Sequence, residues 1–229
     1  MKYPYLLFDA DNTLFDFDGA ERAAHMALCE QYGLAFSEEG YRLYHRCNAE
    51  LWRDFDQGRC TKEFLLVERF RRYLALTGER ADPEELNREH LYQLGENASL
   101  LPGAEQLCRD LAADHRLYLL TNAVESVQRA RFARSAIRPY FQDVFISETI
   151  GWGKPSLEYF QYVFRAVPEL TGENCLVVGD SLSSDIRGAN NAGLPCCWFN
   201  PGALPRPEGL RIDYEIRSLE ELRPIAAQP

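Results

Sequence analysis

Short apolar runs alternate with amphipathic segments along most of the chain. From residue 99 onward the apolar runs have the length of strands, and they lie at 116–121, 144–147, 175–178, 196–199 and, more weakly, 214–216. The segments between them repeat their apolar residues at helical spacing, over 101–111, 124–136, 156–167, 184–192 and a last helix from about 219. Such alternation is typical of a parallel sheet covered by helices on both faces. The apolar run at 5–8 has the same character, and we expect it to join this sheet.

The stretch from residue 20 to residue 97 differs, because it contains helix signals and no convincing strand. Ser37 and Thr61 can each cap the start of a helix, and Asp82 is a cap residue directly before a proline. The fold class is therefore predicted as α/β: a Rossmann-like, doubly wound parallel sheet with an inserted all-helical cap domain. The α/β core domain is expected over 1–18 and 99–229, and the cap over 19–98.

The composition is that of a globular protein, with 46% hydrophobic and 26% charged residues among 229. A net charge of −10 argues against nucleic acid or an anionic membrane as a partner. No apolar run has transmembrane length, and the first carboxylates come too early for a signal peptide. The seven cysteines are odd in number and form no CxxC pair, which favours free thiols in a reducing cytoplasm. We therefore expect a cytoplasmic protein.

Polar side chains follow the expected strands at the points where the strands end. They are Asp9 and Asp11 after the first strand, Thr121 and Asn122 after the apolar residues 117–120, Lys154 after 144–147, and Asp180 and Asp185 after 175–178. Ligands of open parallel sheets bind at the carboxyl ends of the strands, so these side chains should share one site. Hydroxyl and backbone N–H groups at a helix start can hold an anion. Paired carboxylates need a cation between them or a bound proton. The pattern indicates a site for phosphate, metal or both.

Each of these groups also has a structural explanation when it is considered alone. The stretch 9–13 suits a strand end followed by a turn, and Thr121 can cap the next helix. Lys154 can be an ordinary solvated lysine, and Asp185 can complement the positive end of its helix. Asp180 is harder to explain in this way, because a carboxylate directly after a buried strand and a glycine has little structural purpose. The recurrence of useful groups at the strand ends favours a shared functional site.

Four short motifs occur in order along the chain: Asp9-x-Asp11-x-Thr13, Thr121-Asn122, Lys154-Pro155 and Gly179-Asp180-x4-Asp185. In this order they resemble the four motifs of haloacid dehalogenase-like hydrolases. The resemblance spans the whole chain, including a helical cap inserted after the first motif. It implies a magnesium-dependent phosphatase that works through an aspartyl-phosphate. One departure is Asn12, where many relatives carry another acid, but this position is outside the core pattern.

The resemblance also implies catalytic roles. Asp9 would be the nucleophile, and Asp11 would act first as a general acid and then as a general base. Thr121, Asn122 and Lys154 would bind the phosphoryl group of the substrate. Magnesium and Lys154 would offset the repulsion between an attacking carboxylate and a phosphate dianion.

By the same resemblance, Mg²⁺ would be held by Asp9, Asp180 and the backbone carbonyl of Asp11, with support from Asp185. Mg²⁺ prefers oxygen ligands and keeps several waters, so a few protein oxygens suffice. Two other classes share part of this pattern. A 2-haloacid dehalogenase would have no use for a metal or for Asp11 as an acid. A non-enzymatic phospho-acceptor switch would not need a large helical cap.

The spelling of the first and last motifs is most similar to that of bacterial pyrimidine 5'-nucleotidases. Four aromatic residues on one expected cap helix suit stacking on a flat nucleobase, although packing within the cap also accounts for them: Tyr41, Tyr44, Trp52 and Phe55. We therefore predict a phosphomonoesterase for nucleoside 5'-monophosphates, pyrimidine ones first. Phosphoglycolate and sugar phosphates are the alternative substrates. The expected partner is a small phosphorylated metabolite, and the protein can be a monomer or a homodimer.

Overall fold

The computed structural model describes residues 2–228, and its core is a six-stranded sheet. The strands are β1 (Tyr5–Asp9), β2 (Arg116–Thr121), β3 (Phe141–Ile146), β4 (Cys175–Gly179), β5 (Cys196–Phe199) and β6 (Tyr214–Ile216). All neighbouring strands run parallel, in the order β3-β2-β1-β4-β5-β6. This is the strand order of a doubly wound, Rossmann-like sheet, so the predicted fold class is confirmed. Because β1 is central, its carboxyl end lies between those of β2 and β4.

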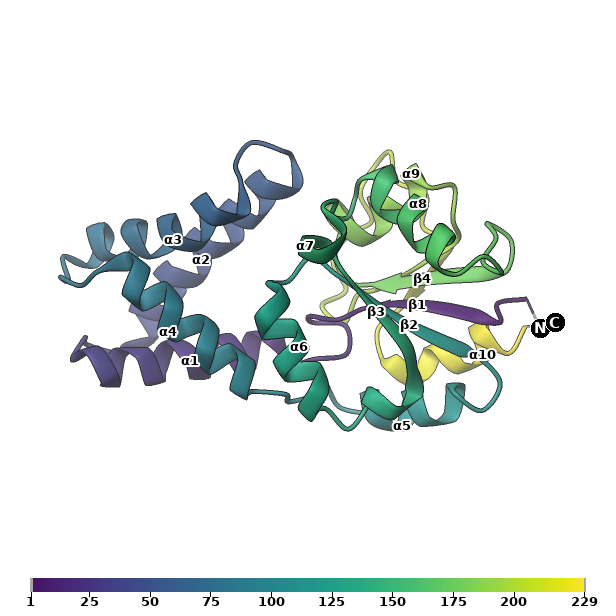
Figure 1. The fold of residues 1–229 in the computed structure, drawn as a ribbon, viewed down its shortest axis with the longest axis horizontal. Coiled ribbons are helices and arrows are strands. Elements are labelled where there is room, and N and C mark those ends of the chain that lie inside the picture. Colours follow the sequence, from purple (N-terminus) through teal and green to yellow (C-terminus); the bar gives the residue numbers. More distant parts are fainter. Residues whose placement is uncertain (1, 229) are drawn as a thin grey trace. The chain divides into compact units, whose positions relative to one another are not determined.

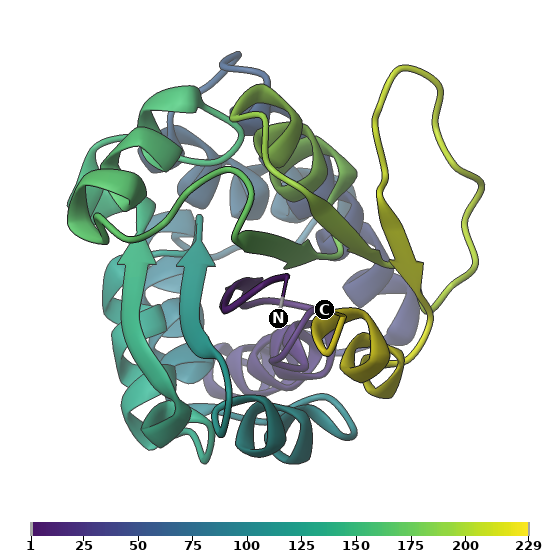
Figure 2. The same cartoon turned by 90° about the vertical axis from the view of Figure 1, so that its right-hand side faces the viewer.

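Helices cover both faces of this sheet (Figures 1 and 2). On one face lie α8 (Leu157–Ala166) and α9 (Arg187–Asn191), and on the other lie α5 (Ala104–Leu111) and α10 (Leu222–Ala226). The remaining helices of this part are α6 (Glu125–Arg134), which follows β2, and the single turn α7 (Ser147–Ile150) after β3. Tighter or wider helical turns occur at Arg138–Tyr140, Leu182–Ile186 and Leu219–Glu221.

The central strand serves two hydrophobic cores, one on each face of the sheet. Side chains alternate along a strand, so Leu6 and Phe8 pack in the core that contains Leu222 of α10. Leu7 points the other way, into the core that contains Phe160 of α8. Burial of both faces explains why β1 reads as a continuous apolar run in the sequence. It also fixes the backbone that carries Asp9 at the end of β1.

Residues Asp18–Asn97 form a second compact unit, separate in its internal contacts from the unit made of residues up to Phe17 and from Ala98 onward. Its helices are α1 (Phe17–Tyr32), α2 (Glu38–Asp56), α3 (Lys62–Thr77) and α4 (Pro83–Glu96). The predicted cap residues are confirmed at three of the starts. The side chains of Ser37, Thr61 and Asp82 accept backbone N–H bonds from Gly40, Phe64 and Glu84. None of the helices among the described residues has both the length and the apolar character needed to cross a membrane.

Candidate active site

Asp9 lies at the carboxyl edge of the sheet, in the middle of the strand order. It is the last residue of β1 and pairs with Leu120, the neighbour of Thr121 on β2. On the other side, Phe8 pairs with Val178, the residue before Gly179 and Asp180. The parallel register therefore brings three of the four motifs to one edge, because each motif begins at the last residue of its strand.

Three carboxylates gather at this edge. Oxygen atoms of Asp9, Asp180 and Asp185 all lie within 4.8 Å of one another. Asp9 and Asp185 are buried and Asp180 is partly buried. These are three of the four predicted metal ligands, and the sequence separates the first from the other two by more than half of the chain. The side chain of the fourth, Asp11, is not in this group.

The ammonium group of Lys154 is buried among these carboxylates. Its Nζ donates to Oδ1 of Asp9 at 2.6 Å, to Oδ1 of Asp185 at 2.7 Å and to the carbonyl of Leu120 at 3.0 Å. Burial by itself lowers the pKa of Lys154, but the charges of Asp185 and Asp9 outweigh it and raise that pKa above its ordinary value. Lys154 is therefore a fixed positive charge beside Asp9 and not an ordinary solvated lysine.

One ammonium does not neutralise this cluster. Burial raises the pKa of Asp9 to about 7, with a further contribution from Asp185 and an opposing one from Lys154. Burial also raises the pKa of Asp180 well above its usual range, and the charges of Asp9 and Asp185 add to the effect. A divalent cation would relieve this excess of negative charge. The donor set is made of oxygen atoms, which is the chemistry that Mg²⁺ prefers. The residues present therefore fit a magnesium ion.

The loop after β4 is shaped by a close approach between Gly179 and Asp185. A Cβ atom on Gly179 would lie 2.3 Å from Oδ2 of Asp185, so only glycine fits here. The same Oδ2 accepts the backbone N–H of Ser181 at 3.0 Å, while Oδ1 contacts Lys154. Both oxygens of Asp185 thus have partners in the protein. This arrangement suits Asp185 to holding Lys154 and the loop in place.

Thr13 fixes the position of Asp180 from the loop after β1. Its buried hydroxyl accepts the backbone N–H of Asp180 at 3.1 Å and donates to Oδ1 of the same residue at 3.3 Å. The indole N–H of Trp198, on β5, donates to the carbonyl of Asp180 at 2.9 Å. The sequence motif contained Thr13 without indicating this contact, and Trp198 had no signal beyond its apolar strand.

Thr121 and Asn122 lie at the end of β2, where α6 is about to begin. The hydroxyl of Thr121 accepts the backbone N–H of Ala123 at 3.0 Å, and the phenol of Tyr159 accepts the backbone N–H of Thr121 at 3.1 Å. Asn122 binds the backbone of Lys154 from both sides: its amide donates to the carbonyl at 2.7 Å and accepts the N–H at 2.9 Å. The side chain of Asn122 therefore positions Lys154, and the sequence had indicated neither this contact nor Tyr159.

Asp11 lies on the loop that follows β1 and has a different partner. Its Oδ1 accepts a bond of 2.5 Å from Nη1 of Arg131, a wholly buried residue of α6. The loop turns through Asn12, whose φ of 57° is in the left-handed region. Asparagine tolerates this conformation better than most residues, which gives the unexpected Asn12 a structural reason. Two different cationic side chains thus hold these acids: Lys154 contacts the acid cluster, and Arg131 contacts Asp11.

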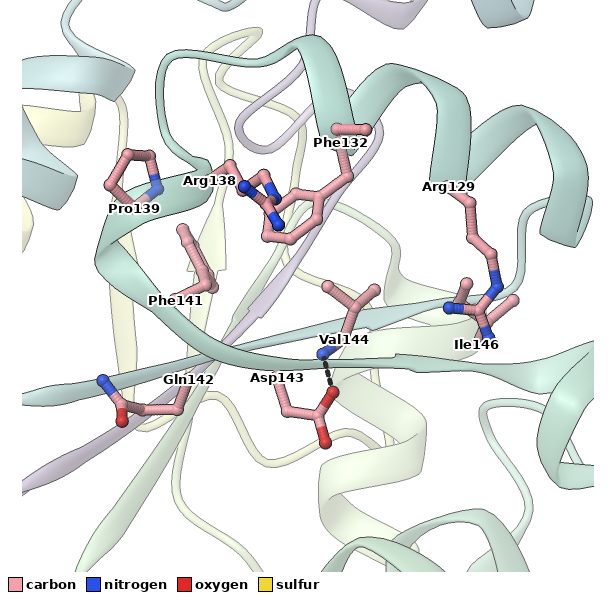
Figure 3. Close-up of a pocket in the computed structure, with 10 residues that line it drawn as sticks. Arg129, Phe132, Arg138, Pro139, Phe141, Gln142, Asp143, Val144 and Ile146 are labelled. Carbon is pink, nitrogen blue, oxygen red and sulfur yellow. Dashed lines mark hydrogen bonds between the residues drawn. The ribbon is translucent and has the colours of Figure 1, made fainter.

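A surface hollow of about 510 Å³ lies elsewhere, between α6 and the edge strand β3 (Figure 3). Its walls include Arg129 and Phe132 of α6 and Phe141 of β3, and none of the predicted site residues is among those that line it. The carboxylate of Asp143, which lines it, accepts the backbone N–H of Val144 at 2.7 Å. This hollow is therefore separate from the site formed by the acid cluster.

Comparison with known proteins supports the motif assignment. A family model described as haloacid dehalogenase-like hydrolase matches residues 3–193. The HAD-hydrolase YfnB of Bacillus subtilis is 38% identical over 96% of this chain and 94% of its own length. Its crystal structure bound to magnesium has a TM-score of 0.95, with both chains wholly covered.

Two further relatives carry names that state a substrate class. The pyrimidine 5'-nucleotidase PynA of Streptococcus pneumoniae is 34% identical over 97% of this chain and 94% of its own length. The pyrimidine 5'-nucleotidase YjjG of Escherichia coli is 32% identical over 98% of both chains. These matches confirm the resemblance that the four motifs predicted, to the family and to its pyrimidine 5'-nucleotidases.

Proposed function

The chain belongs to the haloacid dehalogenase-like hydrolases, and we propose that it is a magnesium-dependent phosphomonoesterase for nucleoside 5'-monophosphates, pyrimidine ones first. The observation that carries this proposal is the cluster of Asp9, Asp180 and Asp185 around the Lys154 ammonium at the sheet edge. A nucleophilic carboxylate beside a fixed positive charge and a metal site is the arrangement that phosphoryl transfer requires.

In the proposed reaction, an oxygen of Asp9 attacks phosphorus and the bond to the nucleoside 5'-oxygen breaks. Asp11 gives a proton to this leaving oxygen, and the phosphoryl group stays on Asp9 as an aspartyl-phosphate. Asp11 then accepts a proton from a water molecule that attacks phosphorus, which breaks the bond to Asp9 and releases phosphate. Dividing one displacement into two lowers the barrier of each step. Lys154, Thr121 and Asn122 hold the phosphoryl oxygens, Thr121 through its hydroxyl and Asn122 through its backbone N–H.

Magnesium would be held by Asp9, Asp180 and the carbonyl of Asp11, while Asp185 keeps the Lys154 ammonium and the loop after β4 in place. When bound, the ion would neutralise negative charge at the phosphoryl group and orient it. Thr13 and Trp198 hold Asp180 beside Asp9, with carboxylate oxygens of the two aspartates within 4.8 Å of each other.

The substrate class rests on two kinds of support. The first is the names of PynA and YjjG. The second is the aromatic residues of the helical unit. The proposed bounds of this unit as a cap domain are residues 19–98. Trp52 and Phe55 are partly exposed and lie edge to face, with ring centroids 5.6 Å apart. Tyr44 is wholly buried in the core of the unit, so it serves packing and not base recognition. Trp52 and Phe55 are therefore the proposed stacking residues.

The proposed location is the cytoplasm, because all seven cysteines are free thiols. The proposed partner is a small phosphorylated metabolite and not a nucleic acid or a membrane, in keeping with the net charge of −10.

The test is a phosphate-release assay with magnesium. It compares kcat/KM for UMP, dUMP and dTMP with the values for phosphoglycolate and hexose phosphates, with Asp9→Asn as the inactive control. We expect a pyrimidine nucleotide to lead the panel by at least about tenfold, the factor that about 1.4 kcal/mol of base recognition supplies. A lead by phosphoglycolate or a sugar phosphate overturns the nucleotide assignment and leaves the phosphatase. Full turnover in Asp9→Asn overturns the mechanism.

A further inference from the structure

Arg131 is the seventh residue of α6, the helix that follows Thr121 and Asn122, and its side chain is wholly buried. Its guanidinium donates to Oδ1 of Asp11 across 120 residues of sequence. The central carbon of the guanidinium lies over the ring of Phe15, 4.6 Å from its centroid, and over the ring of Phe17, 5.8 Å from its centroid. The bond and the two rings together hold the charged group in position.

Burying a guanidinium is costly unless a counter-charge and hydrogen bonds compensate it. One partner of the guanidinium is the carboxylate of Asp11, whose side chain is 26% exposed, on the loop after β1. An aliphatic residue at position 131 would pack against Phe15 without this cost. The retained charge therefore has a use that packing alone does not explain. That use concerns Asp11, since Arg131 reaches it from the helix that follows the phosphate-binding motif.

We propose that Arg131 is a positioning residue that holds the Asp11 carboxyl group at the angle needed to protonate the leaving oxygen. This inference rests on the proposed phosphatase mechanism, in which Asp11 is the general acid. The bond from Arg131 engages Oδ1 and leaves Oδ2 outside this contact, so Oδ2 is the atom that delivers the proton. Proton transfer requires a heavy-atom approach of hydrogen-bond length, which a rotating side chain rarely holds.

A positioning role makes a prediction that depends on the leaving group. The alkoxide that leaves a nucleoside 5'-monophosphate is a strong base and needs a proton in the transition state. The p-nitrophenolate that leaves p-nitrophenyl phosphate is a much weaker base and needs little help. Because kcat/KM reports the steps up to formation of the aspartyl-phosphate, loss of acid catalysis lowers it for the alkyl ester and largely spares the aryl ester. A structural defect in the site lowers both.

The experiment measures kcat/KM of wild type, Arg131→Met and Arg131→Lys with UMP and with p-nitrophenyl phosphate. If the substrate panel finds a better alkyl phosphate, that ester replaces UMP. We expect Arg131→Met to lose at least about 100-fold with the alkyl ester, the lower end of what general acid catalysis contributes, and less than about fivefold with the aryl ester. Arg131→Lys should regain part of the alkyl activity. Arg129→Met, a change at an exposed arginine on the same helix, is the matched control and should retain both activities.

A double-mutant cycle keeps the test decisive if the Arg131 variants are less stable. In an Asp11→Asn background, which has no acid to position, Arg131→Lys should leave the ratio of alkyl to aryl kcat/KM unchanged. Equal losses with both esters, or an unchanged alkyl activity in Arg131→Met, overturn the inference while the phosphatase stands. A wild type that hydrolyses neither ester overturns the proposed function, and this inference with it.

Discussion

The Nζ atom of Lys154 lies 2.6 Å from Oδ1 of Asp9, although 145 residues separate the two in the sequence. Both groups are buried. Burial raises the pKa of Asp9 and the charge of Lys154 opposes this rise, while the charge of Asp9 helps to raise the pKa of Lys154. The parallel sheet makes this contact possible, because it brings β1 and the segment after β3 to one edge. The nucleophile proposed for the reaction is thus already paired with the cation proposed to bind the phosphoryl group.

The first prediction concerns this pair. Lys154→Met should abolish measurable turnover, because the carboxylates would then repel both one another and the substrate phosphate. Its unfolding free energy in chelator should also fall by about 3–5 kcal/mol, the usual effect of removing one partner from a buried ion pair. Denaturant unfolding and phosphate release measure the two effects. Near-wild-type turnover in Lys154→Met would contradict the assigned role.

The second prediction concerns magnesium binding, and it is tested by measuring the thermal stability of the protein and not its activity. Burial raises the pKa of Asp180 in the folded protein, so its ionised form destabilises the fold at neutral pH when no cation is bound. Asp180→Asn should therefore unfold at a higher temperature than wild type in chelator. Wild type should gain stability with increasing magnesium, and Asp180→Asn should gain little.

Differential scanning calorimetry with and without magnesium makes this measurement, and Asp143→Asn is the control, because that carboxylate lies on β3 away from the cluster. An equal magnesium response in Asp180→Asn and wild type would rule out Asp180 as a ligand.

The strands were the most predictable part of the fold. The bounds of β2, β5 and β6 match the predicted runs, because each strand is marked by apolar residues between turn signals. The edge strand β3 begins earlier than predicted, at Phe141 and not at 144. Its Gln142 and Asp143 are exposed, so this half of the strand has no apolar signal.

The site could be predicted only in part, because the sequence shows the motif residues but not the side chains that pack around them. Motif spacing indicates which polar residues end the strands, and strand order then brings them together. The supporting contacts depend on tertiary packing. Arg129, Arg131 and Arg134 look alike in the sequence of α6, yet only Arg131 among them is buried. The local pattern of α6 does not reveal which arginine faces Asp11.

The third prediction separates base recognition from packing in the helical unit. Trp52→Leu should lower kcat/KM for pyrimidine nucleotides by about 5- to 150-fold, because stacking on a base contributes about 1–3 kcal/mol. Its kcat/KM for p-nitrophenyl phosphate should change little. Tyr44→Phe is the matched control on α2: it removes the bond of 3.0 Å to His90 and should cost stability but not nucleotide preference. If the two variants lose nucleotide activity equally, Trp52 has no specific role in recognition.

The last prediction concerns acid stability. His25 is buried in the helical unit and stacks on Tyr44 at 4.7 Å, and burial lowers its pKa to about 4. The unfolded chain has a histidine pKa near 6.5, so it binds more protons than the folded protein between these two values. Stability should therefore fall as the pH drops from about 6.5 toward 4, by up to about 3 kcal/mol from this residue, since one pKa unit corresponds to about 1.4 kcal/mol. His90, whose pKa burial also lowers, adds to the loss.

His25→Phe keeps an aromatic ring against Tyr44 and Tyr73 but cannot be protonated. Urea unfolding of wild type and His25→Phe at pH 7 and pH 5, followed by circular dichroism, separates packing from titration. Any difference between the variants at pH 7 reflects packing, and the change between pH 7 and pH 5 reflects proton binding. The unfolding midpoint should therefore shift less with pH in His25→Phe than in wild type. The same shift in both proteins would show that His25 is not the group whose protonation destabilises the unit in acid.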